Sequence, residues 1–231
     1  MSKVNKTTQL SNLQTALAYQ FTDTELLERA LTHTSVKNKS VGDYERLEFL
    51  GDRVLGLVVA EILWTRFPTE SEGDLAKRHA HLVRGATVAE VATELKMGQV
   101  LALSKGERDS GGRKNPHLLA DACEAVIAAI YLDGGFEEAK RVVSALWEEH
   151  VTSHKQPPRD AKTLLQEWVQ AKGWSLPQYK QVSRDGPPHD PVFTIEVSIH
   201  DQEPSMGKGK SKRTAEQEAA KLMLKKVTDA N

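Results

Sequence analysis

The feature that most constrains the fold is an uninterrupted apolar run near the middle of the chain, residues 125–132 (AVIAAIYL). A helix built from such a run is apolar on every side, and such a helix is buried. Other elements must therefore enclose it. Amphipathic helical patterns cover most of residues 8 to about 150, including a long one over 45–66 that ends before Pro68. The pattern predicts a helical domain around one buried helix.

Two carboxylates, Asp121 and Glu124, lie one turn apart at the head of this buried helix. A buried charge costs several kcal/mol unless it is paired, and no Arg or Lys stands three or four residues from either acid. Three explanations remain open. In the first, the two pKa values rise so that the groups stay neutral. In the second, Asp121 caps the helix N-terminus. In the third, a divalent cation lies between this pair and other acids.

A second acidic turn offers those other acids. In ERLEFLGD, Glu45, Glu48 and Asp52 share an arc of about 60° on one side of a helix, opposite its apolar stripe. A solvated acidic face is the simpler explanation, but like charges at this spacing repel. An all-oxygen ligand set favours Mg²⁺ or Mn²⁺ over Zn²⁺. Phe49 projects beside the acids, away from the core, and suggests a second contact surface.

Composition excludes several classes of protein. The 231 residues carry a net charge of −1, so any nucleic-acid surface must be local. The lone Cys123 excludes an intrachain disulfide and suits a reducing cytoplasm. The N-terminus lacks the apolar run of a secretory signal, and no 18-residue apolar stretch exists to span a membrane.

The pattern changes after a polar, Pro-containing segment at 153–159. A helix ending at Gly173, alternating strand-like segments and a last helix over about 211–228 predict an α-β-β-(β)-α domain. Four cations open the last helix, where backbone N–H groups favour phosphate, although a run of solvated lysines is the plainer reading: Lys208, Lys210, Lys212 and Arg213. GKGKS is not a P-loop, because Pro204 stands where glycine is needed, so no nucleotide cofactor is expected.

The stretch DYERLEFLGDRVLG closely resembles the signature of the ribonuclease III family, endonucleases that cut double-stranded RNA. Further segments follow in the family's order, and the resemblance covers nearly the whole chain: ALTHTS (30–35), SEGDL (71–75), LVRG (82–85), KGERDSGGR (105–113) and LADACEA (119–125). Cys123 stands where an aromatic residue is frequent, and Ala128 where glycine is. Both are packing positions, so these departures bear on local fit more than on chemistry.

The resemblance implies the roles of the acids. Glu48, Asp52, Asp121 and Glu124 look like the inner ligands of Mg²⁺, with Mn²⁺ as a substitute. Asp52 and Glu124 would be catalytic, with Glu45 and Glu72 as supporting carboxylates. The family works as a homodimer with one site per RNA strand, and Phe49 is the candidate dimer contact. The expected products carry 5′-phosphate and 3′-hydroxyl ends.

The tail resembles a double-stranded-RNA-binding domain, on the segments GPPHDPVFTIEV and GKGKSKRTAEQEAA. Such domains read the shape of A-form RNA over about 16 bp. The resemblance implies minor-groove contacts by Gln166, Glu167 and His189, and phosphate contacts by Lys208, Lys210, Lys212 and Arg213. Glu216 stands where a further basic residue is common, which predicts a somewhat weaker grip.

The sequence therefore predicts a multidomain protein. An all-α catalytic and dimerisation domain (1–152) is followed by a linker (153–159) and a small α+β RNA-binding domain (160–229). The expected activity is a Mg²⁺-dependent endoribonuclease that processes ribosomal RNA precursors and structured messenger RNAs in a bacterial cytoplasm. Two alternatives remain: a non-catalytic binder of double-stranded RNA, and a nuclease for duplex DNA.

Overall fold

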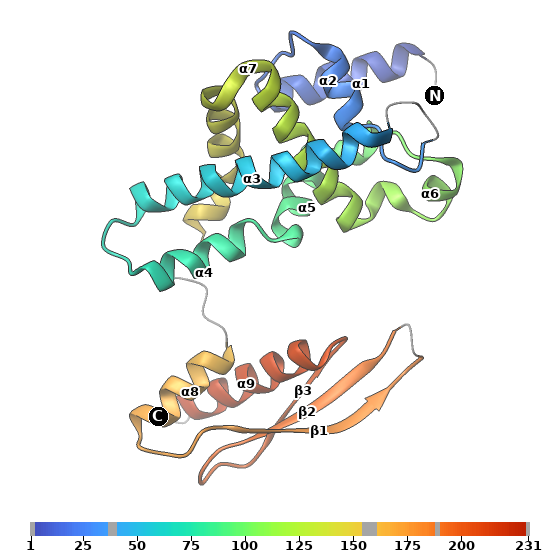
Figure 1. Ribbon diagram of the computed structural model, residues 1–231. Coiled ribbons are helices and arrows are strands. Elements are labelled where there is room, and N and C mark those ends of the chain that lie inside the picture. Colours follow the sequence, from blue (N-terminus) through green and yellow to red (C-terminus); the bar gives the residue numbers. More distant parts are fainter. Residues whose placement is uncertain (1–2, 37–40, 154–160, 188–189, 230–231) are drawn as a thin grey trace. The chain divides into compact units, whose positions relative to one another are not determined.

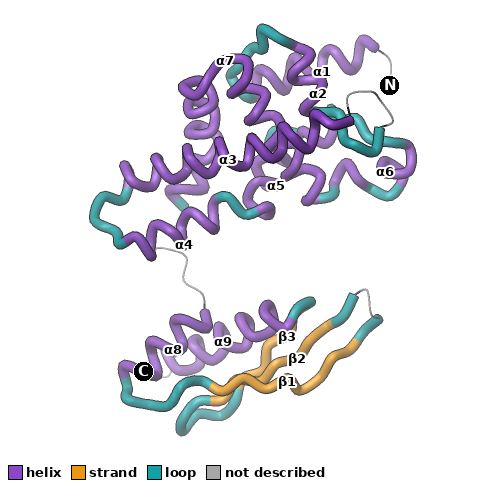
Figure 2. The backbone as a smooth tube through the Cα atoms, in the orientation of Figure 1, coloured by secondary structure: helices purple, strands orange, loops and turns teal. Residues whose placement is uncertain are grey.

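A computed structural model of the chain describes residues 3–36, 41–153, 161–187 and 190–229. The chain divides into two compact units, Met1–Pro158 and Arg159–Asn231. Helices build the first unit, whereas the second combines helices with a sheet (Figures 1 and 2). The predicted fold class, an all-α domain followed by a small α+β domain, is confirmed. In the part of the chain that is described, no helix is both long and apolar enough to cross a membrane.

The first unit consists of helices joined by short connections. In chain order these are α1 (Lys3–Ala16), α2 (Thr24–Ala30), α3 (Val41–Arg66), α4 (Glu72–Leu82), α5 (Gly85–Glu94), the 3₁₀-helix η1 (Met97–Gln99), α6 (Lys105–Asp109), the 3₁₀-helix η2 (Gly112–Lys114) and α7 (Pro116–Thr152).

Helix α7 is the buried helix that the apolar run predicts. Asn115 caps it by accepting a hydrogen bond from the backbone N–H of His117 at 3.0 Å, and Pro116 takes the first helical position. Gly135, at φ 82°, bends the helix, which the glycine pair 134–135 predicts as a break between two helices. Leu132 departs from the pattern, being 51% exposed. The buried side chains before the bend are Leu119, Ala120, Ala122, Cys123, Ala125, Val126, Ile127, Ala128, Ala129 and Ile130.

Helix α3 crosses α7 and packs closely against it (Figure 1). At the crossing, a Cβ on Gly51 would overlap the backbone carbonyl of Glu124. Only glycine permits this approach. The contact between the two backbones therefore fixes how the side chains on either side of Gly51 face α7.

A polar contact ties the start of the unit to the bend in α7. Asp133 accepts hydrogen bonds from the Tyr19 hydroxyl at 2.7 Å and from the backbone N–H groups of Thr22 and Asp23 at 2.9 and 2.8 Å. Asp23, a residue type that favours helix starts, in turn caps α2. These bonds hold the α1–α2 connection against α7.

The glycines and charges of SKGERDSGGRKNP predict a loop, but the segment contains α6 and η2. Ser104 caps α6 by accepting from the backbone N–H of Glu107 at 3.2 Å. Gly111, at φ 87°, then turns the chain into η2. Capping compensates for the glycines, which explains why composition alone misjudged the segment.

The second unit runs α8 (Ala161–Ala171), β1 (Gln178–Asp185), β2 (Val192–Ser198), β3 (Ser205–Gly209) and α9 (Lys212–Asp229). The strands form an antiparallel sheet in the order β1-β2-β3 (Figure 2). Both helices pack together, and α9 lies against β2 and β3. The core contains Leu165, Val169, Val197, Ile199, Ala219, Ala220, Met223 and Val227.

Two details of this unit differ from the alternation expected in the sequence. Alternation along PVFTIEVSIHDQ predicts Thr194 on the polar face of its strand, but it is buried at 7% exposure. Lys208 lies within β3, paired with Thr194, so the basic run begins in a strand rather than in a loop. Ile195, Val197 and Ile199 are buried as expected.

The α3–α7 contact predicts a site-specific cost of adding one methyl group. Gly51→Ala must push the two backbones apart and should lower the free energy of unfolding by about 2 kcal/mol or more. The matched control is Gly56→Ala on the same helix, where the new Cβ meets the His79 ring only at ordinary distance. It should be neutral or stabilising, because alanine favours helix. Urea unfolding followed by circular dichroism measures both, and equal effects would contradict the account.

Candidate active site

The crossing of α3 and α7 brings together carboxylates from two distant segments of the chain. Glu48 on α3 and Asp121 and Glu124 on α7 are all partly buried. The charges of Asp121 and Glu48 both act on Glu124, and that of Asp121 acts on Glu48. Three carboxylates thus share one partly buried region. At Gly51 the backbones of α3 and α7 are in direct contact, without a side chain between them.

Burial raises the pKa of each of these groups, and like charge adds to the rise for Glu48 and Glu124. For Glu124, desolvation comes first and repulsion by Asp121 and Glu48 adds to it, so that the pKa rises from 4.5 to about 7. The positive charge of Arg53 opposes this rise. Desolvation, Asp121 and Glu45 likewise raise the pKa of Glu48. Ionisation of these carboxylates is therefore unfavourable in the folded chain.

Two imidazoles moderate the charge of Asp121. Desolvation raises the pKa of this carboxyl, whereas the nearby His117 and His33 lower it. His117 is one turn earlier on α7, and His33 belongs to the ALTHTS segment after α2. Asp121 is thus the member of the cluster that has imidazoles nearby from two separate segments.

Asp52 and Glu45 lie at the margin of the cluster. Asp52 forms an ion pair with its neighbour Arg53, and the two side chains are 40% and 62% exposed. Glu45 is exposed, one turn before Glu48 on α3. Asp52 is therefore the one predicted metal ligand that already has an arginine partner within the described chain.

The structure narrows the explanations for the buried acids. Asn115, not Asp121, caps α7, so the capping explanation is wrong. In residues 3–36, 41–153, 161–187 and 190–229, no three His, Cys, Asp or Glu side chains stand as a ready-made metal centre. The donor chemistry nevertheless suits a hard cation, because the partly buried oxygens repel one another and an added positive charge would relieve both costs.

Glu72 is not brought to this cluster within the chain. It is the first residue of α4, and α4 runs back along α3, with His79 Nε2 donating to the Gly56 carbonyl at 2.9 Å. Helical rise places Glu48 about 12 Å from that contact in one direction and Glu72 about 10 Å in the other. The two carboxylates therefore lie on the order of 20 Å apart along the helix pair.

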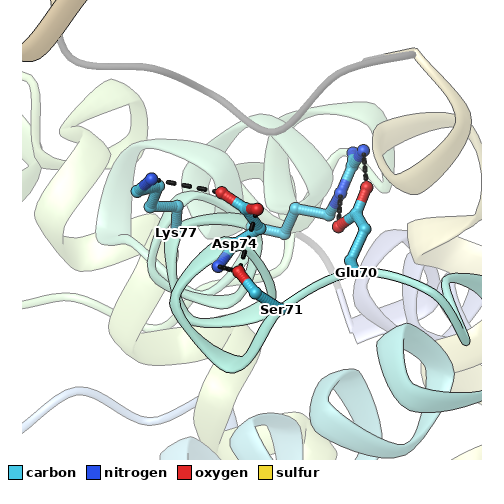
Figure 3. A network of polar contacts seen from close by, with 5 residues as sticks. Glu70, Ser71, Asp74 and Lys77 are labelled. Atoms are coloured by element: carbon cyan, nitrogen blue, oxygen red, sulfur yellow. Dashed lines mark hydrogen bonds and ion pairs between the residues drawn. The ribbon is translucent and has the colours of Figure 1, made fainter. Parts of the chain in front are cut away.

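A polar network fixes the turn that carries Glu72 (Figure 3). Ser71 caps α4 and shares a hydrogen bond with the Asp74 carboxylate at 2.9 Å, and Lys77 pairs with the same carboxylate at 3.1 Å. The buried Arg78 guanidinium donates two hydrogen bonds, of 2.8 and 2.7 Å, to the Glu70 carboxylate. Glu72 therefore lies on an exposed turn that these hydrogen bonds and ion pairs hold in place.

Phe49 lies where a contact surface was expected. It is 63% exposed, and the Arg53 guanidinium lies over its ring at 4.8 Å. Beside it is a groove of about 610 Å³ whose apolar lining includes Leu26, Leu50 and Leu132. An exposed aromatic next to an apolar groove is a surface suited to a second protein.

The second unit gathers its cations at the start of α9. Lys212 and Arg213 are the first two residues of that helix, and Lys208 is exposed on the adjoining strand β3. Lys210, just after β3, pairs at 2.9 Å with Asp190, which belongs to the β1–β2 connection. Predicted contacts on α8 are also accessible: Gln166 and Glu167 are exposed there. His189 lies outside the described residues.

Glu216, which replaces a commonly basic residue, has a structural partner. Its carboxylate accepts a hydrogen bond from Lys162 Nζ at 2.7 Å and so connects α9 to α8. Sequence reasoning treated this residue only as a missing cation. The structure shows a salt bridge within the fold.

Sequence reasoning also overlooked Tyr44. Its side chain is 2% exposed, and the charges acting on its phenol are those of Asp121, Glu48 and Glu124. The signal was available, because Tyr44 and Glu48 stand four residues apart and share one face of α3. A neutral residue among carboxylates gives no charge signal of its own.

The fold and the site define a two-domain protein. A helical domain with a partly buried carboxylate cluster precedes an α-β-β-β-α domain whose cations surround the start of a helix. A family model described as "Ribonuclease-III-like" matches residues 23–149, and one described as "Double-stranded RNA binding motif" matches residues 161–227. The chain belongs to the ribonuclease III family, as the signature predicted.

Individual relatives agree with this assignment. "Ribonuclease 3" of Anaplasma marginale (strain Florida) is 47% identical over 99% of both chains, and "Ribonuclease 3" of Jannaschia sp. (strain CCS1) is 49% identical over 94% of this chain and 95% of its own. Among solved structures, the ribonuclease III nuclease domain of Campylobacter jejuni is 43% identical, with a TM-score of 0.58 over 62% of this chain and 98% of its own. That domain is described as flexible in a region involved in dimer formation.

The raised pKa of Glu124 predicts how stability depends on pH. A carboxyl whose pKa rises on folding, here from 4.5 to about 7, binds its proton more tightly in the folded chain, so its ionisation destabilises the fold across that interval. With metal removed by EDTA, Glu124→Gln should raise the free energy of unfolding at alkaline pH by the order of 1 kcal/mol, allowing for partial exposure. Well below pH 4.5 the gain should vanish.

The control for this measurement is Glu149→Gln, an exposed carboxylate on the same helix. Its unfolding free energy should follow that of the wild type at every pH. A loss of stability in Glu124→Gln at alkaline pH would mean that the charged carboxylate makes a favourable contact, contrary to the electrostatics above.

Proposed function

We propose that this protein is a metal-dependent endoribonuclease that hydrolyses double-stranded RNA and leaves 5′-phosphate and 3′-hydroxyl ends. The observation that carries the proposal is the convergence of Glu48, Asp121 and Glu124 where α3 crosses α7. Family membership supplies the reaction class, and "Ribonuclease 3" relatives match along nearly the whole chain.

The carboxylates explain why a metal is needed. A phosphodiester is anionic, so a pocket of acids alone repels it. Glu48, Asp52, Asp121 and Glu124 would hold Mg²⁺, or Mn²⁺ in its place, which when bound lowers the pKa of a water molecule and neutralises charge that develops on the phosphate. Glu45, one turn before Glu48, serves as a supporting carboxylate, whereas Glu72 lies too far along the helix pair to support this cluster within one chain. Arg53, paired with Asp52, is positioned to share its charge between that acid and Glu124.

The second unit supplies the affinity for duplex RNA. Lys212 and Arg213 lie at the N-terminus of α9, where backbone N–H groups and the helix dipole also favour phosphate. Lys208 and Lys210 extend this basic surface. Gln166, Glu167 and His189 read the minor groove, whose 2′-hydroxyls distinguish RNA from DNA.

Cleavage of both strands requires two sites. We infer a homodimer in which Phe49 and the adjacent groove face the partner. The Campylobacter jejuni domain, with its region involved in dimer formation, supports this inference. In the cell, we place the protein in the cytoplasm, acting on ribosomal RNA precursors and structured messenger RNAs.

The proposal predicts that cleavage and binding separate in one variant. Glu124→Gln should abolish cleavage of a duplex in Mg²⁺, because it removes one charge from the cluster, while the affinity for the duplex stays within a few-fold of the wild type. Gel assays of cleavage and binding on the same duplex measure the two properties. Glu149→Gln, a matched change at an exposed site of α7, should retain both.

Parallel reactions of the wild type distinguish the alternatives. Cleavage in Mg²⁺ but not in EDTA supports the enzyme, whereas binding without cleavage in either would identify a non-catalytic binder. Equal cleavage of a DNA duplex of the same sequence would identify a general duplex nuclease.

The basic surface predicts a change in salt dependence. Lys212→Ala should weaken duplex affinity and reduce the slope of log affinity against log salt by about one phosphate contact. Lys225→Ala, an exposed lysine near the other end of α9, is the control and should leave the slope unchanged. An unaltered slope in Lys212→Ala would remove this residue from the interface.

A further inference from the structure

A buried hydroxyl lies unpaired beside the acidic cluster. The Tyr44 side chain is 2% exposed and packs in the core of the first unit. Its hydroxyl oxygen has no hydrogen-bond partner among the residues that the structure describes. Buried polar groups are nearly always hydrogen-bonded, and one that is not costs folding free energy. Phenylalanine would fill almost the same volume without that cost.

The surroundings of this hydroxyl indicate what it could bind. The charges that act on the Tyr44 phenol are carboxylates, with Asp121 the strongest, followed by Glu48 and Glu124. These are three of the four residues that would hold the metal. A phenol that keeps its proton is a donor, and a carboxylate is its strongest type of acceptor.

The ring itself is held in place. Its edge-to-face contact with the His33 ring has a centroid separation of 5.5 Å, and His33 Nδ1 accepts a hydrogen bond from the backbone N–H of Ser35 at 3.1 Å. Tyr44 also lies one turn before Glu48 on the face of α3 that meets α7. Its hydroxyl is thus directed by two fixed elements.

We propose that Tyr44 is a positioning residue whose hydroxyl donates a hydrogen bond to the Asp121 carboxylate when a divalent cation is bound, holding that carboxylate in its ligating orientation. The inference rests on the proposed function. Ligating carboxylates in proteins are themselves oriented by hydrogen bonds from outside the metal shell, and loss of such a bond weakens metal affinity 10- to 100-fold. The hydroxyl would then be retained for metal binding at the expense of the metal-free fold.

Tyr44→Phe in the full-length chain tests this proposal, because it deletes only the oxygen. The probe is Mn²⁺ alone, titrated without RNA and followed by electron paramagnetic resonance. We expect the Kd for Mn²⁺ to rise about 10-fold. The Mg²⁺ concentration for half-maximal cleavage should rise by a similar factor, while the rate at saturating Mg²⁺ recovers. The midpoint of urea unfolding in EDTA should be unchanged or higher.

Tyr19→Phe is the matched control. Its hydroxyl donates to Asp133 at 2.7 Å, away from the carboxylate cluster, so it serves the fold. We expect the opposite pattern, a lower unfolding midpoint in EDTA with unchanged Mn²⁺ affinity. Wild-type Mn²⁺ affinity in Tyr44→Phe, or a lower unfolding midpoint in EDTA, would overturn the role of Tyr44 and leave the proposed function standing. No Mn²⁺ binding by the wild type would overturn both.

Discussion

The site depends on a contact between two backbones that holds like charges together. At Gly51, α3 approaches the carbonyl of Glu124 more closely than any side chain would allow. Glu48 and Asp121 are carried to the same place, where desolvation raises both pKa values and the charge of Asp121 raises that of Glu48 further. Left alone, such acids would spread apart or take up protons. The packing of the helices around α7 opposes this tendency, so the core stores electrostatic energy that a bound cation can release.

The helical domain could be predicted from its sequence because one pattern, the apolar run, has a single interpretation. A run that is apolar on every side of a helix requires enclosure, and the residues from Ala125 to Ile130 are buried as expected. Helix ends were also predictable where a capping residue stood, as at Asp23. The segment around α6 was misjudged because its glycines and charges are typical of a loop, whereas the cap at Ser104 favours a helix. A local hydrogen bond outweighed residue propensity there.

The site was only partly predictable. Periodicity placed Glu45, Glu48 and Asp52 on one face, but it could not show that Asp52 pairs with Arg53, since neighbours along a helix point in different directions and long side chains bend back. The position of Glu72 depends on the direction in which α4 returns along α3, which no local pattern encodes. Tyr44 was overlooked because burial, which makes its hydroxyl unusual, is a property of the folded chain.

The salt bridge between Lys162 and Glu216 has a consequence for product exchange. It braces the two helices of the small domain and leaves a neutralised pair at Glu216, where a further cation is common. Lys210 is similarly occupied by Asp190. Fewer unpaired cations mean fewer counterions displaced from the duplex on association, and hence a shallower response to ionic strength. The affinity of such a domain for duplex RNA changes less with salt concentration, which suits an enzyme that must release its product after every cleavage.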